Sequence, residues 1–109
     1  LLKQPNLDWI TPGKASILVR QGAGIIDVRL PEEFEERSIR GAVNMPLYRL
    51  REHAVDLDKD QSYVCYCNTG ERSAAAAFIL TKLGFEAYAL AGGLSAMVKQ
   101  MQKKPAAGG

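Results

Sequence analysis

Short apolar runs of strand length alternate along this chain with segments of helical pattern. Apolar, β-branched or aromatic runs predict strands over residues 24–28, 41–44, 62–67 and 87–90. Helices are expected from Pro12 up to Gly22 and over residues 32–36, 47–51, 73–83 and 94–103. Strands that alternate with helices form parallel sheets covered on both faces, so the pattern predicts an α/β fold.

Length and the composition of the C-terminal end predict one domain with a short tail. A chain of 109 residues has the length of a single domain. Residues 105–109 read Pro-Ala-Ala-Gly-Gly and have little to bury, so we expect the domain over residues 1–104 and a flexible tail after it. The chain begins with Leu1 rather than Met, which leaves open that it is a domain of a larger protein.

Composition and charge disfavour several function classes. The chain has 14 Lys and Arg against 12 Asp and Glu, and a net charge of +2 is too balanced to favour a nucleic-acid or membrane partner. No apolar run is long enough to span a bilayer, and no signal peptide is visible. Two cysteines and one histidine are too few for a four-ligand zinc site, so we expect no metal. Two free thiols favour a reducing compartment, and we expect the protein in the cytoplasm.

The candidate chemistry lies where the strand over residues 62–67 runs into the next helix. Cys67 leaves the carboxyl end of this strand, and ligands gather at that edge of parallel sheets. Gly70 favours a left-handed step in the polar turn that follows, and backbone N–H groups of such a turn can bind an anion and lower the pKa of a thiol. Arg72 is a cation at the unfavourable end of the helix dipole, as expected if it faces a thiolate or an anion. The competing interpretations are a buried core cysteine and a solvated arginine.

Several short motifs stand in a characteristic order along the chain. They are Ile26-Asp27-Val28-Arg29, Glu33-Phe34, Gly41 to Pro46, Tyr66 to Ala74, Leu83-Gly84-Phe85 and Ala91-Gly92-Gly93. Together they resemble the rhodanese-like domain family. The resemblance implies a three-layer fold, a five-stranded and mostly parallel sheet between helices, in which Cys67 carries sulfur as a persulfide. It also implies that Asp27 and Arg29 support the active loop. The alternative is that these two residues are surface charges at the end of a strand. The implied substrate-binding loop consists of Asn68, Thr69, Gly70, Glu71, Arg72 and Ser73.

The spacing from Cys67 to Arg72 favours sulfur transfer over phosphoryl transfer. Four residues separate the two in a Cys-x4-Arg motif, whereas phosphatases and arsenate reductases that resemble this fold use Cys-x5-Arg. We therefore expect a sulfurtransferase that moves sulfane sulfur from thiosulfate or a persulfide donor, small molecule or protein, to a thiol or cyanide. Covalent catalysis of this kind needs no cofactor. The alternative is a sulfur-sensing or sulfur-delivery module of a larger multidomain protein, without rapid turnover.

Neighbouring features have simpler interpretations. Cys65 is expected to fill the strand core, with a resolving thiol as the alternative. The glutamates after Pro31 are expected on a solvated helix face. Gly92-Gly93 is expected to form a turn with close backbone approach. Glu71 places a negative charge in the loop, so we expect thiosulfate to be a weaker donor than an uncharged persulfide.

Overall fold

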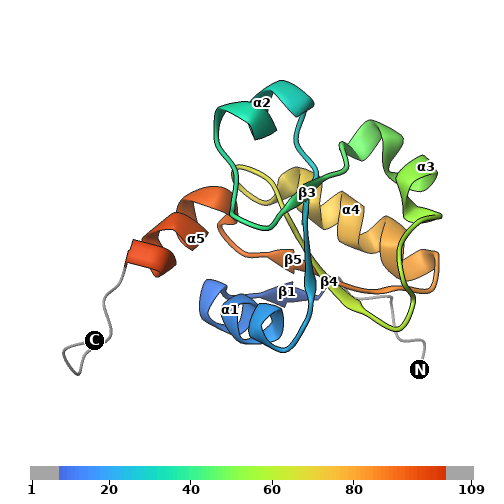
Figure 1. The fold of residues 1–109 in the computed structure, drawn as a ribbon, viewed down its shortest axis with the longest axis horizontal. Helices are drawn as coiled ribbons and strands as arrows, with labels where there is room; N and C mark the ends of the chain where they lie inside the picture. Colours follow the sequence, from blue (N-terminus) through green and yellow to red (C-terminus); the bar gives the residue numbers. More distant parts are fainter. Residues whose placement is uncertain (1–7, 103–109) are drawn as a thin grey trace.

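A computed structural model describes residues 8–102 and shows a five-stranded parallel sheet (Figure 1). The strands lie in the order β1-β5-β4-β2-β3. Their bounds are β1 (Trp9–Ile10), β2 (Gly24–Asp27), β3 (Val43–Asn44), β4 (Ser62–Tyr66) and β5 (Glu86–Leu90). Neighbouring strands are parallel, with Ile26 opposite Cys65 and Cys65 opposite Ala89, so their carboxyl ends meet at one edge.

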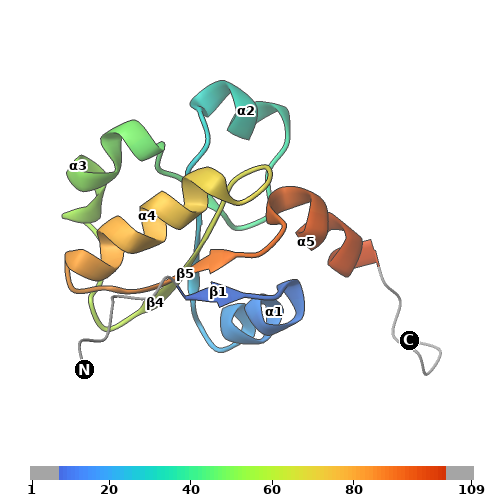
Figure 2. The same ribbon diagram turned by 180° about the vertical axis from the view of Figure 1, so that it is seen from behind.

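Helices cover both faces of this sheet. Their bounds are α1 (Pro12–Arg20), α2 (Pro31–Glu36), the 3-10 turn η1 (Leu47–Arg49), α3 (Leu50–Ala54), α4 (Glu71–Lys82) and α5 (Gly93–Gln102). α1 packs with α5 on one face, whereas α3 and α4 pack with each other on the opposite face (Figure 2). The predicted α/β fold with helices on both faces is confirmed. Within residues 8–102, no helix is both long and apolar enough to cross a membrane.

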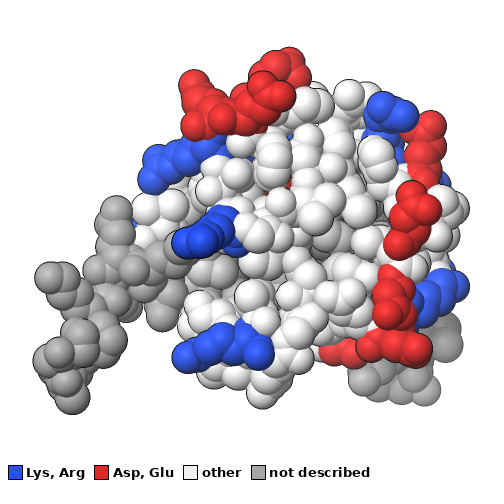
Figure 3. All heavy atoms as spheres, in the orientation of Figure 1, with Lys and Arg blue, Asp and Glu red and all other residues white. Residues whose placement is uncertain are grey.

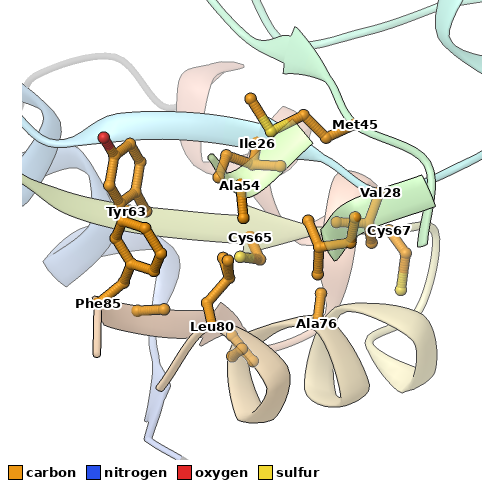
Figure 4. Close-up of a cluster of buried hydrophobic side chains, with 14 residues drawn as sticks. Ile26, Val28, Met45, Ala54, Tyr63, Cys65, Cys67, Ala76, Leu80 and Phe85 are labelled. Atoms are coloured by element: carbon orange, nitrogen blue, oxygen red, sulfur yellow. The ribbon is translucent and has the colours of Figure 1, made fainter. Parts of the chain in front are cut away.

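The alternation of side chains along β4 divides the core into two layers. Val64 and Tyr66 point to the face of α1 and α5, where they join a cluster that includes Ala15. Cys65 points to the opposite face and packs in a second cluster with Leu80 of α4 (Figure 4). Apolar burial on both faces fixes the position of β4 in the middle of the sheet. It thereby also fixes the position of Cys67, which directly follows β4.

The structure adds one strand to the sequence prediction and moves the bounds of two helices: the helix expected over residues 47–51 is a 3-10 turn followed by α3, which continues to Ala54, and α4 begins earlier than expected. β1 is two residues long and is defined by its pairing with β5, where Trp9 lies opposite Ala89, so no local run of residues marks it. α4 begins at Glu71 rather than Ser73, because a carboxylate is favourable in the first turn of a helix. Lys103, Lys104 and the expected tail over residues 105–109 lie outside the described residues.

Candidate active site

A short turn over residues 67–70 connects β4 to α4 and carries Cys67 at its start. Gly70 stands immediately before α4 with a φ of 124°, a conformation that other residues adopt only under strain. A Cβ at this position would also lie 3.2 Å from Cζ3 of Trp9. The predicted strand–turn–helix arrangement is therefore present, with a glycine where the backbone needs one.

The sulfur atom of Cys67 lies inside the turn, among hydrogen-bond donors. The N–H of Gly70 donates to Cys67 Sγ at 3.0 Å, and the N–H of Ser73 donates to it at 3.4 Å. The hydroxyl oxygen of Ser73 lies 3.7 Å from the same sulfur. Cys67 is only 1% exposed, so these groups replace most of the water around the thiol.

Burial and hydrogen bonding act on the Cys67 thiol in opposite directions. Burial raises its pKa, but the N–H and hydroxyl of Ser73 and the N–H groups of Gly70 and Thr69 stabilise the thiolate. The pKa of Cys67 is therefore lowered overall from that of an ordinary thiol. For Cys65, burial alone raises the pKa to about 12, so this thiol stays protonated in the core. Both thiols are free.

The first residues of α5 pack against the main chain of the turn and form a hydrogen bond with it. The N–H of Leu94 donates to the carbonyl oxygen of Cys67 at 2.8 Å. Gly93 packs so tightly on the turn that a Cβ would lie 2.5 Å from this same oxygen, and its φ is 63°. The expected close backbone approach at Gly92-Gly93 is confirmed. A second carbonyl, that of Gly70, accepts a hydrogen bond from the Ser73 hydroxyl at 2.9 Å.

Glu33 of α2 connects two residues of the loop segment. Its carboxylate accepts from the Arg72 guanidinium at 2.7 and 3.2 Å and from the Asn68 side chain at 3.0 Å. The N–H of Leu30 donates to it as well, at 2.9 Å. Mainly through the hydrogen bond from Arg72, the pKa of Glu33 falls to about 2.

The expectation of a solvated face is wrong for Glu33, whose side chain is only 29% exposed and paired with Arg72. The other glutamates of α2, at positions 32, 35 and 36, are exposed as expected. A signal for Glu33 was available in the order of elements. α2 follows β2 after a few residues, so its first turn lies at the same edge of the sheet as Cys67.

Asp27 and Arg29, at the end of β2, form a buried ion pair next to the loop. Arg29 Nη2 lies 2.7 Å from Asp27 Oδ2, and Arg29 Nε donates to Oδ1 at 3.0 Å. Arg29 Nη1 also donates to the side-chain oxygen of Asn68 at 3.1 Å, and Nη2 donates to the carbonyl of Arg37. With exposures of 0% for Asp27 and 3% for Arg29, these residues are not the surface charges of the alternative interpretation.

Arg72 points to Glu33 rather than directly to the sulfur. Its pKa is raised first by the hydrogen bond with Glu33, while the charge of Cys67 makes a smaller contribution. Arg72 was expected to face a thiolate or an anion, and the anion with which it pairs is the carboxylate of Glu33. The structure brings the remaining loop residues together at this edge, with Asn68, Thr69 and Glu71 exposed and Gly70 and Ser73 buried.

The sequence of this chain matches the family described as Rhodanese-like domain over residues 12–100. The chain belongs to this family. Its rhodanese-like fold is also seen in a solved structure, the rhodanese-related protein from Thermoplasma volcanium. That structure superimposes with a TM-score of 0.78 at 30% identity, covering 85% of this chain and 92% of the other.

Two sequence relatives of this rhodanese-like domain differ in length. The thiosulfate sulfurtransferase PspE of Escherichia coli K12 is 38% identical over 71 residues, which cover 63% of this chain and 68% of PspE. The probable adenylyltransferase/sulfurtransferase MoeZ of Mycobacterium tuberculosis is 40% identical over 98 residues, which cover 87% of this chain. The match spans only 23% of MoeZ, so in that relative the rhodanese-like domain is one part of a larger protein.

Proposed function

We propose that this rhodanese-like domain is a sulfurtransferase that carries sulfane sulfur as a persulfide on Cys67. The observation that carries the proposal is the environment of Cys67 Sγ, a buried sulfur that accepts hydrogen bonds from the N–H groups of Gly70 and Ser73. These donors favour the thiolate, which is the nucleophile in sulfur chemistry. The sulfurtransferase names of PspE and MoeZ support the same reaction class.

The proposed reaction has two displacement steps at sulfur. The Cys67 thiolate attacks the outer sulfur of thiosulfate, the S–S bond to sulfite breaks, and sulfite leaves with the electron pair of that bond. A persulfide donor reacts in the same way and leaves as a thiolate. In the second step a thiolate or cyanide attacks the outer sulfur of the persulfide and restores the Cys67 thiolate. Atoms and electrons balance without a metal or cofactor.

The loop residues have distinct roles in this proposal. The N–H groups of residues 68–73 hold the outer sulfur of the persulfide in this proposal, and the N–H groups of Gly70 and Ser73, which already donate to Cys67 Sγ, support it. Arg29, anchored by Asp27, supports the loop through its hydrogen bond to Asn68. Two free thiols favour a reducing compartment, so the proposed location is the cytoplasm, and the proposed partners are the sulfur donor and the thiol acceptor.

A cyanide assay tests the proposal directly. The protein is incubated with thiosulfate and, separately, with a small-molecule persulfide, and thiocyanate formation is followed after adding cyanide. We expect turnover in the wild-type protein and none in Cys67→Ser. Mass spectrometry of the donor-treated protein is expected to show one added sulfur atom, located on the peptide that contains Cys67. Thiocyanate formation that survives in Cys67→Ser would falsify the proposal.

The match to MoeZ favours a second candidate, a delivery or sensing domain within a longer protein. Such a domain would still form the persulfide on Cys67 but would release sulfur slowly to small acceptors. Persulfide seen by mass spectrometry together with little thiocyanate turnover is the result that distinguishes it from the free-standing enzyme.

A further inference from the structure

Both arginines that contact the loop are already paired with a carboxylate. Arg29 pairs with Asp27, and Arg72 pairs with Glu33. A donor that approaches Cys67 therefore meets guanidinium groups whose positive charge is balanced. The exposed Glu71 adds a negative charge in the first turn of α4.

We propose that Glu33 sets the charge selectivity of Cys67 by neutralising Arg72, so that the site favours reactants of low negative charge. For sulfur transfer this rests on the function proposed above, but the electrostatic effect at Cys67 does not. Glu33 acts here as a specificity-determining residue, since it touches the loop through Arg72 and Asn68 and does not contact the sulfur.

The geometry gives Glu33 this effect through its contact with Arg72. Its carboxylate forms a two-pronged hydrogen bond with the guanidinium, which holds Arg72 in one orientation beside the loop. The same helix carries Glu32, Glu35 and Glu36, and Figure 3 shows the acidic side chains gathered over α2, but these three residues are exposed and solvent screens their charges. A dianion such as thiosulfate interacts with any charge at this entrance twice as strongly as a monoanion, and a neutral reactant does not respond.

The variant Glu33→Gln removes the charge and keeps part of the hydrogen bonds. A glutamine oxygen can still accept from Arg72 Nη1 and from the N–H of Leu30, whereas the hydrogen bond from the Asn68 side chain is lost. Glu35→Gln is the matched control, because it removes the same charge from an exposed position on the same helix.

Alkylation of Cys67 measures the electrostatic effect without any turnover. The rate with iodoacetate, an anion, is divided by the rate with neutral iodoacetamide, and a change in thiolate fraction cancels in this ratio. We expect Glu33→Gln to raise this ratio of rates about threefold, because one negative charge near a partly exposed site is removed. The control Glu35→Gln should leave the ratio within about 1.3-fold of wild type. The double variant with Arg72→Gln should return to the wild-type ratio, because the charges at both positions are then gone. An unchanged ratio in Glu33→Gln overturns the proposal.

Wild-type protein alone provides a check that does not depend on any variant folding. The iodoacetate-to-iodoacetamide ratio at Cys67, divided by the same ratio for β-mercaptoethanol, should be about one or lower if the positive charge at the site is balanced. A value well above one means that the net field at Cys67 attracts anions, and it overturns the proposal.

Sulfur transfer gives the second arm of the test. Thiosulfate and benzenethiosulfonate donate sulfur by the same displacement but carry two charges and one. In Glu33→Gln we expect kcat/KM to rise about fivefold for thiosulfate and about twofold for benzenethiosulfonate, mainly through KM. Equal changes for both donors overturn the selectivity role. If the wild-type protein transfers no sulfur from either donor, the proposed function fails instead, and the alkylation ratios still decide the role of Glu33.

Discussion

Cys65 and Cys67 lie two residues apart on the same face of the sheet and are both buried, yet their chemistry differs (Figure 4). Cys65 lies within β4, where the strand uses its main-chain groups to pair with β2 and β5, and burial raises its pKa to about 12. Cys67 lies just after β4, where the main chain turns and its N–H groups point to the sulfur, and its pKa is lowered. Burial therefore does not decide reactivity, whereas the direction of nearby peptide groups does.

The largest expected difference between the two thiols is their rate of alkylation at neutral pH. We expect Cys67 to react with iodoacetamide at least about a thousandfold faster than Cys65, because a thiol of pKa about 12 is almost entirely protonated. The rate at Cys67 should rise with pH around a midpoint below that of the urea-denatured protein. Peptide mass spectrometry assigns the label. Comparable labelling of the two residues in the folded protein would refute the distinction.

The same pKa shift has a consequence for stability. Because the folded protein holds the Cys67 thiolate better than the unfolded chain does, the thiolate adds stability above the unfolded thiol pKa. This contribution is lost as the pH falls through the lower pKa of the folded state. Replacing Cys67 by serine should remove that part of the pH dependence.

Displacing the turn while leaving β4 intact should remove the activity of Cys67. Gly93→Ala places a Cβ 2.5 Å from the Cys67 carbonyl oxygen at a residue with a φ of 63°. We expect a loss of sulfur-transfer activity of about a hundredfold and of stability of about 2 kcal/mol. Gly13→Ala is the control, since no atom lies within 4 Å of its Cβ position. Full activity in Gly93→Ala would mean that the turn tolerates displacement.

Removing the Ser73 hydroxyl, which lies beside Cys67 Sγ, should produce a smaller effect. Ser73→Ala deletes the hydroxyl that lies 3.7 Å from Sγ and that donates to the Gly70 carbonyl. The pKa of Cys67 should rise, and alkylation at neutral pH should slow by about threefold. The exposed Ser95 offers a matched Ser95→Ala control. An unchanged pH profile would assign the whole pKa shift to the main chain.

The smallest functional effect is expected at Cys65. Cys65→Ala should leave sulfur transfer within about twofold of wild type and lower the free energy of unfolding by about 1 kcal/mol, through the lost packing against Leu80. Activity and chemical denaturation are measured on the same preparation. A large loss of activity without loss of stability would indicate that Cys65 acts as a resolving thiol.

The sequence predicted those parts of the molecule that local patterns determine. The apolar and aromatic run over residues 62–67 and the glycine at position 70 are properties of short segments, and the structure has a strand and a turn there. β1 was missed because its two residues become a strand only by pairing with β5. The ion pair of Glu33 with Arg72 was missed because the partners are 39 residues apart and meet only through the topology of the sheet.

The carbonyl oxygens at the two ends of the turn, those of Cys67 and Gly70, accept hydrogen bonds from the N–H of Leu94 and from the hydroxyl of Ser73. The N–H groups of Gly70 and Ser73, in contrast, donate to Cys67 Sγ. A charge that moves from sulfur to sulfur within this cradle finds dipoles that are already aligned and do not have to rotate. The turn thus surrounds the sulfur with fixed dipoles. Its position depends on Gly93 at the start of α5, which takes no part in the chemistry.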